Sequence, residues 1–195
     1  MVDFKEKVER YKALLIKWNK AINLFSRKLP IEELDLHIRD CEFLAESMAE
    51  EKDKAVLDFG TGNGMPGIVL SIYGFKCIFV ERNKKKGAFL REAIRELGLD
   101  ALVVDEDITN VYDELEDMSP GVISSKAVAK AEDIISLCKP LIKKDTVIYL
   151  LKNTGTMEEL EVAKKRYDFS SQIIENKKLG GKVVMKISAV QDKDE

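Results

Sequence analysis

Residues 57–67 read LDFGTGNGMPG and hold four glycines in eleven positions. An apolar run, residues 55–59, leads into this stretch, and Pro66 stands where a following helix would begin. Glycine adopts positive φ without strain and lets a ligand approach the backbone closely. A glycine-rich turn between a strand and a helix is also where an open parallel sheet binds its ligands. The stretch therefore predicts a strand–loop–helix unit that binds a ligand.

Short apolar runs alternate with helical patterns from residue 55 onward. The runs are AVLDF, CIFV, ALVV, GVIS and TVIYLL, and the helical patterns include KKKGAFLREAIRELG and AEDIISLCKPLIKK. Such alternation is typical of a doubly wound parallel sheet with helices on both faces. Near the end, YDFSSQIIEN and GKVVMKISAV follow one another across KKLGG without a helix, which predicts an antiparallel hairpin at the sheet edge.

The first part of the chain has a different texture, with helical spacing and no strand pattern. Apolar residues spaced by three and four along residues 4–22 predict one amphipathic helix, and Pro30 opens a second. A chain of 195 residues with 45% hydrophobic content is long enough for one domain with its own core. We expect residues 1–195 to form a single domain, with N-terminal helices over 1–53 and a cofactor-binding sheet over 54–195.

Composition excludes several classes of protein. No apolar run approaches the roughly 20 residues of a membrane span, and the N-terminus is charged, so we expect a cytoplasmic protein. The three cysteines lie far apart and His37 is the only histidine, so the chain has no zinc-ligand spacing and no basis for a Ser-His-Asp site. A net charge of −3 argues against a protein that coats nucleic acid indiscriminately.

An acid closes the second apolar run and indicates the kind of ligand. Glu81 there is suited to accept hydrogen bonds from two ribose hydroxyls, which favours a nucleoside. The candidates are a dinucleotide and S-adenosylmethionine, because residues 62–67 also satisfy GxGxxG. Asp58 would suit an amino group better than a pyrophosphate, and Pro66 lacks an N–H that a pyrophosphate would use. We favour S-adenosylmethionine, with an NAD-dependent oxidoreductase as an alternative.

Motifs along nearly the whole chain resemble the GidB/RsmG family of bacterial small-subunit rRNA methyltransferases. LLIKWNKAINL is similar to that family's N-terminal helix motif, and HIRDCEFL to its His-x-x-Asp-Ser-Leu helix. LDFGTGNGMPGIVLSI resembles its cofactor loop, and VERNKKKGAFLREAIRELGL its second strand and following helix. SSKAVA resembles the Ser-Arg-Ala-Val-Ala loop after the fourth strand, and YLLKN the Lys-Gly that closes the fifth.

The resemblance implies a fold, a reaction and partners. It implies a class I methyltransferase (Rossmann-like) α/β fold with an antiparallel C-terminal strand and an N-terminal helical extension. It implies methylation of guanine N7 in small-subunit rRNA, within free RNA or the 30S particle, with S-adenosylmethionine as cofactor and no metal. We expect a monomer. The cofactor would be held at the ends of the first strands, with its adenine at the turn of residues 107–108, by Asp58, Gly60, Gly62, Gly64, Met65, Glu81, Asp107, Ile108 and Lys126.

Three departures from the family pattern concern the site. Lys126 stands where the family usually has arginine, Met65 replaces a phenylalanine, and VVDEDITN lacks the customary Arg-Ala-Glu. Lysine keeps the charge but loses the planar fork of arginine. Lys126 can still donate to guanine O6 while N7 stays free, and we predict that it is the catalytic residue. The same departures leave open a non-catalytic relative that binds cofactor or ribosomal particle. We interpret His37, Trp18 and Asn19 as structural.

Overall fold

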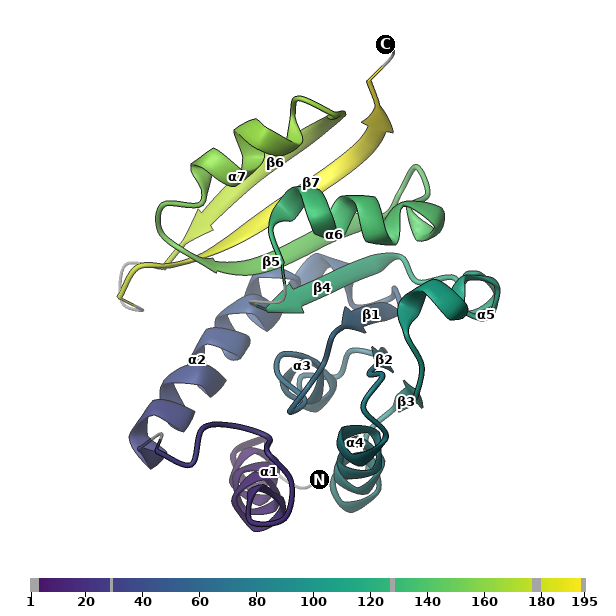
Figure 1. The fold of residues 1–195 in the computed structure, drawn as a ribbon. Coiled ribbons are helices and arrows are strands. Elements are labelled where there is room, and N and C mark those ends of the chain that lie inside the picture. The colour runs from purple at the N-terminus through teal and green to yellow at the C-terminus, as the bar shows by residue number, and fades with distance from the viewer. Residues whose placement is uncertain (1–3, 29, 127–128, 177–179, 194–195) are drawn as a thin grey trace.

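The computed structural model describes residues 4–28, 30–126, 129–176 and 180–193. Within them, seven strands form one sheet in the order β3-β2-β1-β4-β5-β7-β6 (Figure 1). The strands are β1 (Val56–Phe59), β2 (Cys77–Val80), β3 (Ala101–Val104), β4 (Val122–Lys126), β5 (Val147–Asn153), β6 (Tyr167–Glu175) and β7 (Lys182–Asp192). β1 to β5 run parallel, whereas β7 is antiparallel to both β5 and β6. The predicted α/β fold with a reversed C-terminal edge is confirmed.

Helices cover both faces of the sheet. They are α1 (Phe4–Asn19), α2 (Ile31–Ser47), α3 (Gly67–Ile72), α4 (Lys84–Leu97), α5 (Tyr112–Asp117), α6 (Ala131–Cys138) and α7 (Met157–Ala163), with 3-10 turns η1 (Ala49–Glu51), η2 (Ile108–Asn110) and η3 (Lys139–Leu141). α1 to α4 lie on one side of the sheet, and α5, α6 and α7 on the other (Figure 1). Successive side chains of a strand point to opposite faces of the sheet, so each strand contributes to the apolar core on either side. Val56 packs in the core beneath α1 to α4, and Leu57 packs in the core beneath α5 to α7.

The first helix is shorter than the sequence pattern predicts. It ends at Asn19 rather than continuing to Ile22. The Asn19 side chain is buried, and its Oδ1 accepts hydrogen bonds from the backbone N–H groups of Leu24 (2.8 Å) and Phe25 (3.1 Å). Asparagine favours such local bonds over a further helical turn. The side chain therefore ends the helix and fixes the connection to α2, in agreement with the structural interpretation of Asn19.

Parallel pairing brings the ends of the central strands to one edge. Val56 of β1 lies opposite Cys77 of β2 and Val122 of β4. The glycine loop after β1, Glu81 after β2, the turn after β3 and Lys126 at the end of β4 consequently lie at the same edge of the sheet. This is the carboxyl edge, where open α/β sheets bind ligands.

Candidate functional site

The loop after β1 is built on glycines that other residues could not replace without strain. Gly62 has φ +59° and Gly64 has φ +91°. A Cβ on Gly64 would lie 2.6 Å from Ile68 Cγ1 and 3.0 Å from the Tyr11 hydroxyl. The Gly62 N–H donates to Glu81 Oε2 at 2.9 Å, which ties the loop to the end of β2. The glycines thus hold the loop close to its neighbours and leave its backbone open to approach at Gly60 and Gly62.

Asp58 lies beneath this loop rather than in it. The residue is fully buried, and its Oδ2 accepts a hydrogen bond from the Gly67 N–H at 2.9 Å at the start of α3. Oδ1 has no hydrogen-bond partner among the described residues. Burial raises the pKa of Asp58 to about 7. The carboxyl group therefore supports the loop from inside and lines none of the cavities at this edge.

A first cavity of about 390 Å³ opens between the loop and the ends of β2 and β3. Its lining includes Gly60, Glu81, Asp107 and Ile108, together with apolar side chains of Phe59, Val80 and Leu137. Glu81 is only 8% exposed, and its two oxygens accept backbone N–H groups of Gly62 and Asn83. Each carboxylate oxygen can accept more than one hydrogen bond, so Glu81 retains acceptor capacity toward the cavity. Apolar walls beside one fixed carboxylate suit a nucleoside.

The turn after β3 forms the far wall of this cavity. Asp107 caps η2 and accepts hydrogen bonds from the backbone N–H (3.2 Å) and hydroxyl (3.0 Å) of Thr109. These bonds, followed by the nearby Arg82, lower the pKa of Asp107 and keep it ionised. Ile108 is buried behind the turn. The pair offers a backbone edge and a carboxylate at the rim of the cavity.

A second cavity, also about 390 Å³, lies on the other side of Gly60. Its floor is the glycine loop, and its walls come from the α1–α2 connection, α2, α4 and β4; the lining is Leu24, Phe25, Ser26, Leu34, His37, Gly60, Thr61, Gly62, Asn63, Met65, Lys86 and Lys126. Gly60 lines both cavities, so the two meet at the loop. The two cavities together can hold one ligand that passes across the glycine loop and a second ligand next to it.

Lys126 faces the second cavity from the end of β4. Its Nζ lies 3.9 Å from Met65 Sδ, and among the described residues no carboxylate lies within ion-pair distance of it. Its ammonium group is therefore open to an acceptor of a ligand in the cavity. The rest of the SSKAVA loop, Ala127 and Val128, lies outside the described residues.

The position of His37 differs from the expectation that it is a purely structural residue. It lies in the wall of the second cavity, and its Nδ1 is 3.9 Å from Oδ2 of buried Asp40. Burial, followed by the positive charge of Lys126, lowers the pKa of His37. Phe25 and Ser26 also face this cavity, although no motif in the sequence marks them. The only available signal was the spacing of His37 and Asp40 in HIRDCEFL.

The site residues predicted from the sequence thus lie in three places: the first cavity, the second cavity and the region beneath the glycine loop. Gly60, Glu81, Asp107 and Ile108 line the first cavity, and Gly60, Gly62, Met65 and Lys126 line the second. Asp58 and Gly64 are absent from both linings and pack beneath the loop.

The family model for rRNA small subunit methyltransferase G matches residues 4–184. This chain belongs to that family. Among curated family members, the protein named ribosomal RNA small subunit methyltransferase G in Gluconobacter oxydans is 32% identical over 187 residues, which cover 94% of this chain and 92% of the relative. The protein of the same name in Pasteurella multocida is 35% identical over 173 residues, covering 87% and 79%.

Solved methyltransferase structures share the fold of this family member. The O-methyltransferase from Bacillus cereus in complex with SAH superposes with a TM-score of 0.62 at 14% identity, over 92% of this chain and 90% of that one. The precorrin-6y C5,15-methyltransferase from Geobacter metallireducens gives a TM-score of 0.51 at 17% identity, over 75% and 86%. The class I methyltransferase architecture is therefore shown independently of sequence.

The described residues hold neither a membrane-spanning helix nor a cluster of metal ligands. No helix there combines the length and apolarity needed to cross a membrane. No three His, Cys, Asp or Glu side chains there gather in a way that could hold a metal ion.

Proposed function

We propose that this protein uses S-adenosylmethionine to methylate guanine N7 in small-subunit ribosomal RNA. The observation that carries the proposal is the pair of cavities that meet at Gly60 in a chain of this family. One is bounded by a nearly buried carboxylate, Glu81, and the other by the ammonium group of Lys126, which has no acid partner in the described part of the chain. A nucleoside cofactor and a guanine base have the complementary polar groups.

The residues of the first cavity fit S-adenosylmethionine. Glu81 has acceptor capacity for the ribose hydroxyls, the turn of Asp107 and Ile108 would face the adenine, and the loop of Gly60 and Gly62 would pass along the rest of the cofactor. When bound, the cofactor supplies an electrophilic methyl group on its sulfonium. Asp58 and Gly64 would contribute by holding the loop in shape from beneath.

The second cavity would take the guanine. Guanine N7 carries a lone pair and no proton, so no side chain has to act as a general base. The chain has to hold the base in place, and orientation of this kind accounts for roughly 7–11 kcal/mol of barrier reduction in favourable cases. Lys126 would donate to guanine O6 and leave N7 free. Met65 and Phe25 would supply apolar contacts to the base.

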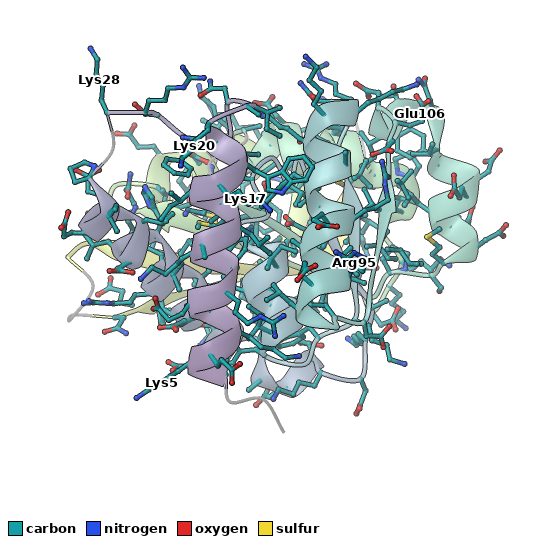
Figure 2. All side chains as sticks on the ribbon, turned by 90° about the horizontal axis from the view of Figure 1, so that it is seen from below. Lys5, Lys17, Lys20, Lys28, Arg95 and Glu106 are labelled. Carbon is teal, nitrogen blue, oxygen red and sulfur yellow. The ribbon has the colours of Figure 1, made fainter. Side chains whose placement is uncertain are left out.

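Basic residues beside the second cavity suit an RNA partner. Lys20 and Lys28 lie at the same end of the molecule as Glu106 of the first cavity, and Lys5 lies at the opposite end (Figure 2). Lys86 reaches the second cavity itself from the start of α4. Lysines so placed would contact phosphates and orient the RNA.

We further propose that residues 1–195 act as one methyltransferase domain, as a monomer, on small-subunit rRNA or the 30S particle in the cytoplasm. Side chains of α1, α2 and the sheet, such as Tyr11, Leu44 and Phe79, belong to one apolar core, which favours a single unit.

The proposal is tested by mapping N7-methylguanosine in rRNA from cells with and without this protein. We expect one small-subunit guanosine to lose the modification when the protein is absent, and purified protein with S-adenosylmethionine to restore it on subunits from those cells. An unchanged map would overturn the proposal. Cofactor binding without methyl transfer to purified subunits would instead identify a non-catalytic family member.

A further inference from the structure

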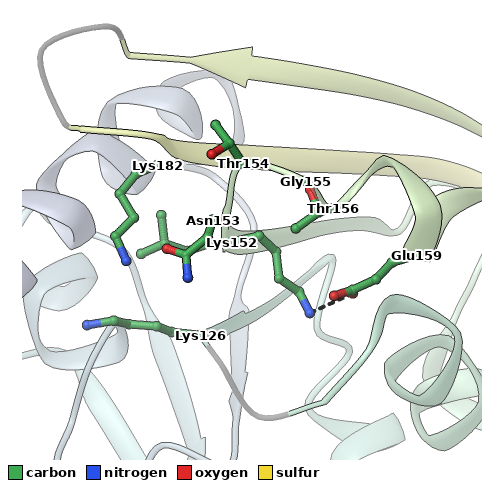
Figure 3. Close-up of a pocket in the computed structure, with 9 residues that line it drawn as sticks. Lys126, Lys152, Asn153, Thr154, Gly155, Thr156, Glu159 and Lys182 are labelled. Atoms are coloured by element: carbon green, nitrogen blue, oxygen red, sulfur yellow. Dashed lines mark hydrogen bonds and ion pairs between the residues drawn. The ribbon is translucent and has the colours of Figure 1, made fainter.

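A third cavity, of about 340 Å³, lies beside the second at the ends of β4, β5 and β7. Figure 3 shows its lining, which includes three lysines, Lys126, Lys152 and Lys182, together with Asn153 and Glu159. Lys126 lines both this cavity and the second one. A group bound here would therefore be adjacent to the proposed position of the guanine.

The charges of this cavity do not cancel. Lys152 is tied down, because its Nζ donates to Ala129 O (2.6 Å) and to Glu159 Oε2 (2.8 Å). Lys182 Nζ lies 3.5 Å from Oδ2 of Asp40, which is buried behind it on α2. Lys126 has no acid partner among the described residues. Three ammonium groups face two carboxylates, so the cluster complements a ligand with one negative charge.

The donors of the cavity converge. Lys182 is the cross-strand partner of Asn153, so β7 and β5 hold these two side chains next to each other. Figure 3 shows Lys182, Asn153 and Lys126 pointing toward the same open space, whereas Lys152 turns away toward Glu159. Two ammonium groups and an amide around one space form a donor set for an anion with several acceptor oxygens.

We propose that this cavity is a binding site for one phosphodiester group of the rRNA backbone, next to the guanine that is methylated. The inference rests on the proposed function. A phosphodiester carries a single negative charge, which matches the excess charge of the cluster. Lysines bind phosphate as point charges and position the RNA without reading its sequence. The three N–H groups of Lys126 allow it to contact the phosphate and guanine O6 together.

The experiment measures binding of the protein to purified small subunits over a series of salt concentrations. Lys182→Gln should weaken binding about tenfold at low salt, because a charged contact is lost. It should also lower the slope of log K against log salt by about 0.7–0.9, the share of one phosphate. Lys182→Arg should retain both values. Lys144→Gln is the matched control, because this exposed lysine precedes β5 at the opposite edge of the sheet.

A second variant guards against a folding defect, since Lys182 also braces Asp40. Asn153 is exposed at the end of β5, and Asn153→Asp places a negative charge against the phosphate at almost unchanged volume. We expect Asn153→Asp to weaken binding to subunits several-fold and Asn153→Ala to weaken it less.

Three results would overturn the phosphate site. In the first, Lys182→Gln keeps the wild-type salt slope. In the second, Asn153→Asp binds subunits as tightly as Asn153→Ala. In the third, Lys182→Gln loses calorimetric affinity for S-adenosylmethionine, which would assign the cavity to the cofactor carboxylate. Methylation by the wild-type protein is measured separately, so a failure of the proposed function remains distinguishable from a failure of this site.

Discussion

At the scale of single residues, the surroundings of Asp58 and Lys126 distinguish the inside of the site from its surface. Asp58 is a fully buried carboxyl group, one oxygen of which has no hydrogen-bond partner within the described ranges. Lys126 is half-buried, and its ammonium group faces two cavities. Burial penalises the charge of Asp58, whereas the open cavities leave the charge of Lys126 available to a ligand. Lys126 can therefore be tested through the rate of methylation, and Asp58 through the pH dependence of the free energy of unfolding.

Lys126→Met should lower the methylation rate on small subunits by at least tenfold. The side chain keeps its length but loses a charge-assisted hydrogen bond to guanine O6, worth about 1.5–3 kcal/mol. Affinity for S-adenosylmethionine, measured by calorimetry, should stay within a few-fold, and Lys126→Arg should remain active. If the methionine variant matches the wild type in rate and in cofactor affinity, Lys126 has no role in the site.

Asp58 should make the free energy of unfolding fall as pH rises from about 4 to 7. The carboxyl group ionises near 3.9 in the unfolded chain and at about 7 in the folded protein. Between these values the folded state holds a proton that the unfolded state has released, so stability declines by up to about 1.4 kcal/mol per pH unit and levels off above pH 7. Asp58→Asn does not titrate. Urea unfolding from pH 4.5 to 8 should show this decline in the wild type relative to the variant; parallel pH profiles would contradict it.

At the scale of elements, the α1–α2 connection is a structured wall of the second cavity. Leu24, Phe25 and Ser26 line that cavity from a segment without helix or strand, and the buried amide of Asn19 fixes its course. One side chain that satisfies two backbone N–H groups thus couples the end of a helix to the shape of the site.

Asn19→Ala should destabilise the protein by about 1–3 kcal/mol, because it removes the acceptor of the Phe25 N–H and the nearer of the two acceptors of the Leu24 N–H. We also expect KM for small subunits to rise while calorimetric affinity for S-adenosylmethionine is unchanged. Asn23→Ala is the control, because Asn23 is exposed in the same connection. Equal stability of the two variants in urea unfolding would refute this role of Asn19.

At the scale of the whole molecule, the order of the strands brings the site together. β1 and β4 are neighbours in the sheet, although Leu57 and its paired residue Ile123 are 66 positions apart in the chain, with a helix-rich segment between them. β2 and β3 therefore lie to one side of the glycine loop, and β4 and β5 to the other. The first cavity, lined by Gly60 and Glu81, forms on the side of β2 and β3. The cavities lined by Lys126 form on the other side, as the switch point of a doubly wound sheet requires.

S-adenosylmethionine at 100 times its Kd should stabilise the folded protein by about 2.7 kcal/mol, because it binds the folded state only. For a chain of this size the melting temperature should rise by roughly 5–10 °C in a thermal unfolding scan. NAD at the same concentration should leave it unchanged. A shift with NAD and none with S-adenosylmethionine would favour the oxidoreductase alternative.

The sequence by itself determined the fold class and the position of the glycine loop and Glu81 at one edge of the sheet. The sequence predicts the features of residues 57–67 and Glu81 because they depend on residue type and position alone. Gly62 adopts positive φ because it is a glycine, and Glu81 places a carboxylate at the end of a strand because it follows an apolar run. The alternation of apolar runs and helices likewise predicts a parallel sheet from local periodicity. These features can be predicted from the sequence because each depends only on residues within a few positions of one another in the chain.

Only the tertiary structure decided which distant side chains share a cavity. His37 and Phe25 face Lys126 because α2 and its preceding connection pack at the sheet edge, and Lys182 meets Asn153 because β7 pairs antiparallel with β5 in one register. Asp58 is buried beneath the loop because α3 begins directly above it. Such proximity arises from packing between elements far apart in the chain, which no local pattern encodes.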